Sequence, residues 1–197
     1  MFYFRGGVDT EIIIQQVATT EQFDLALAYV RAIYKRKFGT FPKSLGKNCL
    51  IAECGEDIVG VIAMQFSEGE RFEFENNFLL DFSILNQPRA RCVSFGRWVA
   101  TKPGAGNALM CAAVKHSIAL GKTHSISCSK TETLRALHRR YGLRYDVLAV
   151  PVIAEQVLEE DRNFFLSKPS PCLCFALLSQ WYDRLVLSVP AHVKINL

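Results

Sequence analysis

One segment, residues 93–121, constrains the fold of this chain more than any other. A β-branched and aromatic stretch ends at Val99-Ala100-Thr101, a glycine-bearing turn follows at 102–108, and an apolar helix then runs to about Leu120. Such a turn exposes backbone N–H groups and the positive end of the helix dipole, a combination that binds phosphate. The turn is neither a Walker loop nor a dinucleotide fingerprint. An ordinary strand-to-helix connection is the alternative, and the segment alone favours neither.

Short β-rich and helical stretches alternate on both sides of this segment. A capping box at Thr19 and Gln22, followed by apolar residues at helical spacing, predicts a helix to about Lys37. This order predicts one domain, 1–197, of the α/β (α+β) class, in which helices flank both faces of a mixed sheet. We expect strands at 11–17, 49–54, 58–66, 91–100, 123–129, 145–153 and 171–178, helices at 104–120 and 131–141, and short helices near 76–84 and 154–166.

Composition excludes several function classes. Half of the 197 residues are hydrophobic, which argues against disorder, and no apolar run approaches the roughly 20 residues that span a bilayer. The net charge of +4 is too small for a dedicated nucleic-acid binder. The seven cysteines form no CxxC pair, so we expect reduced thiols in a cytoplasmic protein rather than a metal site.

A second informative segment, residues 129–143, holds a histidine on a predicted helix. Leu134, Leu137 and Tyr141 share one face of this helix, and His138 lies beside them. Histidine titrates near neutrality and can act as a general acid or base, whereas a lone helical histidine is more often structural.

The order of these parts resembles the GNAT acyltransferase superfamily over roughly residues 11–153. In that family a glycine-rich turn after the fourth strand takes the pyrophosphate of an acyl thioester, with Gln or Arg three residues before its first glycine. Thr101 stands at that Gln/Arg position, followed by Gly104 and Gly106. A later family pattern with a catalytic Tyr falls on Thr131, Leu134, His138, Gly142 and Leu143, so His138 replaces the Tyr. The resemblance implies a mostly antiparallel central sheet.

Within the superfamily the chain looks most like the branch of acyl-homoserine-lactone synthases, N-acyl amino acid synthases and thermostable hemolysin-like proteins. The fourth strand of lactone synthases carries Glu-x-Ser-Arg and that of the hemolysin-like family Glu-x-Gly-Asn. Here Ser94-Phe95-Gly96-Arg97 combines the Gly and the Arg, and Ser94 replaces the Glu. The Asp pair of lactone synthases is missing from KSLGKNCL at 43–50, which argues against lactone synthesis from S-adenosylmethionine.

The resemblance implies transfer of an acyl group from a thioester to an amine, with no permanently bound cofactor. His138 would protonate the leaving thiolate, Ser94 would relay a water, and an N–H near Val99 or Ala100 would stabilise the oxyanion. Arg97 would clamp an acceptor carboxylate, or else pair with Asp81 or Glu75. The implied thioester-binding residues are Trp98, Val99, Ala100, Thr101, Gly104, Ala105, Gly106, Asn107 and Ala108.

Two basic clusters suit the donor, since coenzyme A is polyphosphorylated and acyl carrier protein is acidic. They are Arg31, Lys35, Arg36, Lys37, Lys43 and Lys47, and Arg135, Arg139, Arg140 and Arg144. Either cluster could equally be a solvated helix face. A small-molecule amine, such as an amino acid, is the expected acceptor, with no nucleic acid and no membrane span.

Four points stay open in the sequence. Cys128, next to the expected cleft, is a nucleophile or a core residue, and core packing is favoured. A group of apolar residues either lines an acyl tunnel or caps the sheet: Phe72, Phe74, Phe78, Leu79, Leu80 and Phe82. The changes at Ser94, Thr101 and His138 also fit a GNAT-like binding protein without catalysis. The alternative to a small-molecule acceptor is an amine on a protein.

Overall fold

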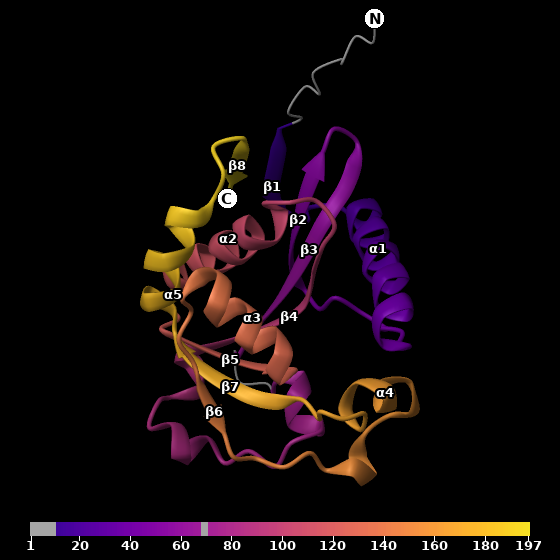
Figure 1. Cartoon of the computed structure of the whole chain (residues 1–197), viewed down its shortest axis with the longest axis vertical. Helices are drawn as coiled ribbons and strands as arrows, with labels where there is room; N and C mark the ends of the chain where they lie inside the picture. The colour runs from indigo at the N-terminus through magenta and orange to yellow at the C-terminus, as the bar shows by residue number, and fades with distance from the viewer. Residues whose placement is uncertain (1–10, 68–70) are drawn as a thin grey trace, which may run out of the picture.

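The computed structural model describes residues 11–67 and 71–197 and contains an eight-stranded sheet (Figure 1). The strand order is β6-β7-β5-β4-β3-β2-β1-β8. Only the β4–β5 and β1–β8 pairs are parallel, so the sheet is mixed and mostly antiparallel, as expected. The strands are β1 Ile12–Gln16, β2 Asn48–Cys54, β3 Asp57–Phe66, β4 Cys92–Ala100, β5 His124–Ser129, β6 Asp146–Leu148, β7 Cys172–Leu177 and β8 Val193–Asn196.

Helices cover both faces of this sheet. They are α1 Thr20–Phe38, α2 Ala105–Ala119, α3 Thr131–Tyr141, α4 Arg162–Phe165 and α5 Leu178–Leu185. The predicted capping box opens α1: the Thr19 hydroxyl accepts from the Gln22 N–H, and the Gln22 side chain accepts from the Thr19 N–H. Gly39, at φ +65°, ends α1 in the left-handed conformation that glycine adopts without strain.

Three predictions about the secondary structure were wrong. The strand expected at 145–153 covers only Asp146–Leu148, because Pro151 cannot donate to a ladder. It also pairs with β7, which inserts between β5 and β6. The strand at 171–178 is not the last element: α5 and β8 follow it, and β8 pairs with β1. In place of a helix near 76–84, short 3₁₀ turns occupy Glu73–Asn76, Phe82–Leu85 and Arg89–Arg91.

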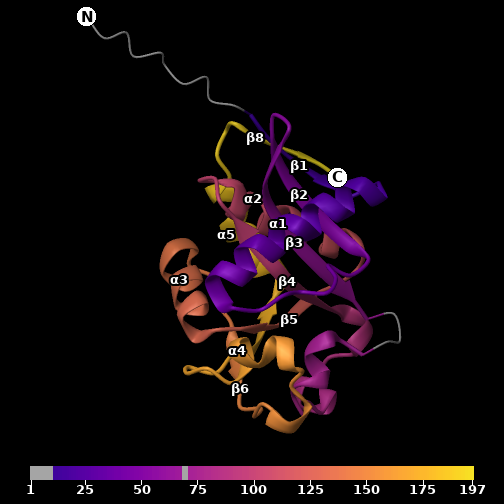
Figure 2. The same cartoon turned by 90° about the vertical axis from the view of Figure 1, so that its right-hand side faces the viewer.

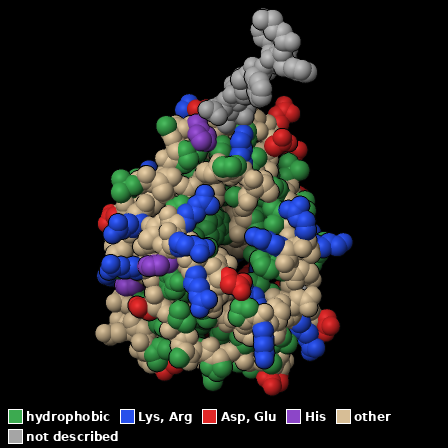
Figure 3. Space-filling view, in the orientation of Figure 1, with side chains coloured by type: hydrophobic (Ala, Val, Ile, Leu, Met, Phe, Trp, Pro, Cys, Tyr) green, Lys and Arg blue, Asp and Glu red, His purple; other side chains and the backbone are tan. Residues whose placement is uncertain are grey.

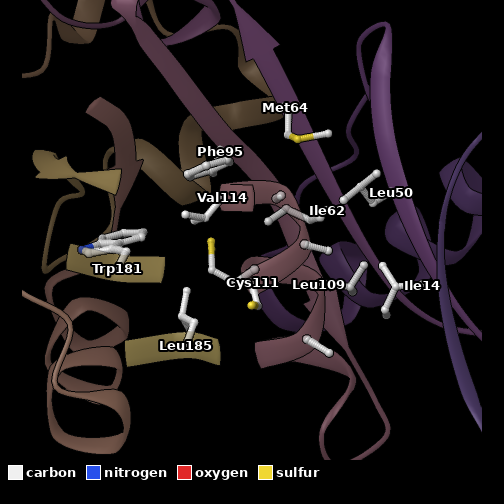
Figure 4. Packing of buried hydrophobic residues seen from close by; sticks show 14 of the residues in the cluster. Ile14, Leu50, Ile62, Met64, Phe95, Leu109, Cys111, Val114, Trp181 and Leu185 are labelled. Carbon is white, nitrogen blue, oxygen red and sulfur yellow. The ribbon is translucent and has the colours of Figure 1, made fainter. Parts of the chain in front are cut away.

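The largest core lies between the sheet and helices α2 and α5. Leu109, Cys111 and Val114 of α2 face side chains from four strands and from α5 (Figure 4). At Gly60 of β3 a Cβ would come within 2.7 Å of the Leu109 side chain, so β3 and α2 are in close contact there. The labelled partners of the α2 residues are Ile14, Leu50, Ile62, Met64, Phe95, Trp181 and Leu185.

Two smaller cores complete the packing. On the other face of the sheet, α1 lies across β2 and β3 (Figure 2) and packs Ala26, Leu27 and Val30 against it. The four phenylalanines of 72–82 and Leu80 pack in the third core with Ile126 and Leu173, whereas Leu79 is exposed. These aromatic residues therefore cap one end of the sheet, as the second of the two sequence interpretations expects. Of the described helices, none is long and apolar enough to cross a membrane.

Candidate active-site cleft

A cleft forms where the two parallel strands at the centre of the sheet separate. β4 and β5 pair only at Cys92–His124 and Val93–Ser125. The Phe95 N–H then donates to the Ser127 hydroxyl at 2.9 Å instead of to a strand carbonyl. Beyond this point the β5 side of β4 has no strand partner among the described residues, and residues of both strands line a cleft.

A bulge in β4 sets which side chains enter this cleft. The β3–β4 register shifts between the pairs Val61–Val99 and Ala63–Gly96, and Arg97 has φ +52°. The extra residue reverses the alternation of the strand: Phe95 and Trp98 both pack on the α2 side, although they are three residues apart. Arg97 consequently lies on the α1 side, with its guanidinium carbon 6.0 Å from the centre of the Tyr34 ring.

The cleft has a volume of about 520 Å³, which suits a small-molecule or cofactor-sized ligand. Its walls come from α1, β4, the turn that leads into α2, β5, α3 and Phe164 of α4. Phe38 and Phe164 meet edge to face at 5.7 Å between ring centres and close one end. This aromatic end wall has no sequence signal, because the contact joins helices that are far apart in the chain.

Six of the nine predicted thioester-binding residues line the cleft: Trp98, Val99, Ala100, Gly104, Gly106 and Asn107. Ala105 and Ala108 face the core, and the Thr101 hydroxyl bonds the Tyr29 hydroxyl at 3.0 Å.

The turn begins α2 with a glycine and without a side-chain cap. Gly104 takes φ +86° and makes no side-chain capping hydrogen bond, and a Cβ at this position would lie 2.9 Å from the Pro190 side chain. The Trp98 indole donates to the Gly106 carbonyl at 3.0 Å and so holds the first turn of α2 against β4. The Asn107 amide donates to the Ser188 carbonyl and fixes the same turn to the C-terminal part of the chain.

Five cations line the cleft, and no acidic residue is among the described lining residues. The cations are Lys37, Arg97, Lys102, Lys130 and Arg140. Figure 3 shows lysine and arginine side chains gathered on both sides of a hollow on this face. Lys130 is already bonded to the Ser167 and Pro169 carbonyls at 3.0 and 2.7 Å, and burial lowers its pKa. The lining favours anionic groups such as phosphate and carboxylate.

Arg97 pairs with a carboxylate that the sequence did not single out. Its Nη2 lies 3.3 Å from Oε2 of Glu73. Neither sequence candidate is the partner: Glu75 forms a two-pronged pair with Arg89, and Asp81 caps the turn at Ser83. The pairing depends on how the segment 71–91 folds back over β4, which periodicity does not encode.

The structure does not bring His138 or Ser94 into the cleft. His138 lines a separate hollow of about 630 Å³ with His124, Arg144 and Tyr145, and its Nδ1 lies 3.1 Å from the Leu143 carbonyl oxygen. That hollow has neither the open edge of β4 nor the N-terminal turn of α2 among its lining residues. Among the α3 residues that line the cleft, Tyr141 carries a phenolic hydroxyl and lies one turn beyond His138. The sequence placed Tyr141 on the packed face without assigning it a role.

Cys128 lines the cleft as a half-buried neutral thiol. Burial raises its pKa, and the neighbouring Cys174 and Cys172 add to the rise, while Lys130 and Arg97 oppose it. A thiol with a raised pKa is a poor nucleophile at neutral pH. The geometry thus agrees with the packing role that the sequence favoured.

The sequence finds no match among protein-family models or curated proteins, but solved structures match over most of the chain. FeeM, an N-acyl amino acid synthase from uncultured soil microbes, is 10% identical over 90% of this chain and 96% of that chain, with a TM-score of 0.65. BjaI, a CoA-dependent acyl-homoserine lactone synthase, is 14% identical over 94% and 93%, with a TM-score of 0.60.

A third match is an acetyltransferase of the GNAT family from Staphylococcus aureus, 8% identical over 84% of this chain and 99% of that chain, with a TM-score of 0.52. At these identities the likeness establishes the fold. The expected architecture is confirmed: the chain has the fold of GNAT acetyltransferases and of the autoinducer and N-acyl amino acid synthases.

Proposed function

We propose that this protein is an N-acyltransferase that moves an acyl group from a thioester to an amine. The observation that carries the proposal is the β4–β5 separation, which joins an open strand edge, an uncapped helix N-terminus and a cationic lining in one cleft. FeeM and BjaI, which share this fold, are named as enzymes of N-acyl amino acid and acyl-homoserine lactone synthesis, the latter CoA-dependent.

The thioester donor would lie along the open edge of β4. The N–H groups of a strand point alternately to its two sides, and the Thr101 N–H already donates to the Val59 carbonyl on the β3 side. The Val99 N–H points the same way, so the Ala100 N–H points into the cleft. Ala100 is therefore the better of the two sequence candidates for binding the thioester oxygen. The phosphates would meet the helix end at Gly104 and Gly106.

In the reaction, the amine nitrogen attacks the thioester carbonyl carbon, an N–C bond forms and the C–S bond breaks. The leaving thiolate takes a proton, for which we assign the Tyr141 hydroxyl in place of His138, because Tyr141 lines the cleft and His138 does not. The amine gives up its proton to solvent water, since neither Ser94 nor a described acidic side chain lines the cleft.

The donor is coenzyme A or an acyl carrier protein, and the charges around the cleft suit both. Lysine and arginine residues of α1 and α3, the elements that carry most of the two basic clusters, lie on the two sides of the cleft. Arg31 is excluded as a docking residue because its guanidinium already donates to the Pro42 and Lys43 carbonyls. The other exposed lysine and arginine residues of the two clusters would attract either the phosphates of coenzyme A or the acidic surface of an acyl carrier protein.

The direct test is release of free thiol from acyl-CoA, and from acyl carrier protein, in the presence of an amino acid mixture. We expect thiol release that depends on the amine, together with an N-acylated product in the mass spectrum. Thermal stabilisation by acyl-CoA without any product would instead support a non-catalytic binding protein. A mass shift on an added protein alone would identify a protein amine as the acceptor. No stabilisation and no thiol release with any donor would refute the proposal.

A further inference from the structure

We propose that the acceptor is an amine that also carries a carboxylate, such as an amino acid, and that Arg97 binds this carboxylate. The inference rests on the proposed N-acyl transfer and names the class of acceptor. It would make Arg97 the residue that determines acceptor specificity.

The position of Arg97 supports this role. The β4 bulge, with φ +52° at Arg97, turns the side chain into the cleft in a backbone conformation that non-glycine residues rarely adopt. Its Nε is shielded from solvent and has no hydrogen-bond partner within 11–67 and 71–197. A guanidinium offers a planar pair of donors that matches a carboxylate, so a bound carboxylate would satisfy this buried donor.

Glu73 would hold the place of that carboxylate in the free protein. Its side chain is 62% exposed and touches Arg97 through one oxygen at 3.3 Å. The neighbouring pair differs: the Glu75 side chain is 3% exposed and meets Arg89 through both oxygens. Exposed single contacts contribute little to stability, so an incoming carboxylate could displace Glu73 but not Glu75.

The surroundings of Arg97 favour an anion. The other cleft cations carry the same sign of charge, and the nearby Cys128 thiol is neutral because burial raises its pKa. Burial raises the pKa of the neighbouring Tyr34 hydroxyl, Arg97 lowers it, and Asp161 adds to the rise. The Phe38–Phe164 end wall lies in the same cleft and offers an apolar surface for the rest of the acceptor.

The test compares phenylalanine with phenethylamine, which differ only in the carboxylate, as acceptors with one acyl-CoA. We expect the kcat/KM of the wild type to be about tenfold to a hundredfold higher for phenylalanine than for phenethylamine. A ratio of this size corresponds to the free energy of one charge-assisted hydrogen bond. In Arg97→Asn the ratio of the two kcat/KM values should fall to near one. Asn tolerates the positive φ, so the fold should survive, and thermal unfolding checks this. Arg97→Lys should give an intermediate ratio, because Lys keeps the charge but loses the planar donor pair.

Two further variants sharpen the result. Arg184→Ala removes an exposed arginine of α5 outside the cleft lining and should leave the ratio unchanged. Glu73→Gln should lower KM for phenylalanine about twofold to fivefold by removing the competing carboxylate. A fall in kcat in this variant would instead contradict the proposal that Glu73 only occupies the carboxylate position beside Arg97 in the free protein.

The inference and the proposed function fail in different ways. Equal wild-type use of both acceptors, or a preference for phenylalanine that survives in Arg97→Asn, would overturn the role of Arg97 while acyl transfer stands. Absence of amine-dependent thiol release with every acceptor would remove the proposed function itself.

Discussion

The two edges of β4 behave in opposite ways. Toward β3 the strand is paired from Val93 to Ala100, interrupted by one bulge, whereas toward β5 it pairs at two positions only. On the β3 side the backbone N–H and C=O groups are used for the sheet. On the β5 side the backbone beyond Val93 has no strand partner among the described residues, and Gly96 to Ala100 line the cleft.

This difference separates stability from binding within one strand. The paired half, β1 to β4, carries the largest core, so changes there should act on folding. The part of the sheet where β4 and β5 separate holds the cleft, so substitutions there should change ligand binding and the rate of the reaction. The four predictions below test this division, in order of decreasing expected effect.

Truncation in the paired half should cost the most stability. Leu50→Ala removes a fully buried side chain from the main core and should lower the unfolding free energy by about 2–5 kcal/mol. Phe38→Ala removes a half-buried ring from the cleft wall and should cost about 1 kcal/mol. Urea unfolding at constant pH measures both. Equal losses would show that the cleft wall is as important to folding as the core.

Chemistry should depend on Tyr141 and not on His138. Tyr141→Phe removes only the proton that the cleft would supply and should lower kcat by about a hundredfold. His138→Ala changes the other hollow and should alter kcat by less than about twofold, the scale of a change outside the site. Steady-state kinetics with one acyl-CoA and one amine compare them. A larger fall in kcat in His138→Ala than in Tyr141→Phe would instead identify His138 as the general acid.

Alkaline pH should destabilise both halves through their buried thiols. Burial raises the pKa of Cys49 in β2 to about 12, and it raises the pKa of Cys174 in β7 to about 12. The unfolded chain loses these protons from about pH 8.5, whereas the folded chain keeps them. Stability is therefore full below that pH, and each thiol lowers it by about 1.4 kcal/mol per pH unit above it. Chemical unfolding of the wild type and Cys49→Ala between pH 8 and 10 should show a shallower slope in the variant, and identical slopes would contradict this.

The smallest effect is expected at the start of α1, one wall of the cleft. Thr19→Ala removes the hydroxyl that accepts from the Gln22 N–H and should cost about 1 kcal/mol. Thr19→Ser, which keeps the hydroxyl, is the matched control, and thermal unfolding measures the pair. If the two variants were equally stable, the capping box would contribute nothing.

The sequence predicted the elements that depend on local signals. The strand, glycine turn and helix of 93–121 and the capping box at Thr19 follow from residues close together in the chain. The position of β7 between β5 and β6 and the pairing of β8 with β1 do not, since they depend on contacts between distant segments.

The site was predicted in part for the same reason. The turn residues Gly104 and Gly106 line the cleft because the fold fixes where a strand-to-helix turn lies. Choosing between His138 and Tyr141 requires the rotation of α3 about its axis, which is set by tertiary packing. The contact of Arg97 with Glu73 requires the path of an irregular segment, for which the sequence has no periodic signal.

Amide hydrogen exchange with and without acyl-CoA tests most directly whether the β4–β5 cleft is the thioester site. We predict slower exchange on addition of acyl-CoA in peptides covering Trp98 to Ala108, with unchanged exchange around His138 and Tyr145. Protection confined to the His138 hollow, or no protection at Trp98 to Ala108 at saturating acyl-CoA, would contradict the account.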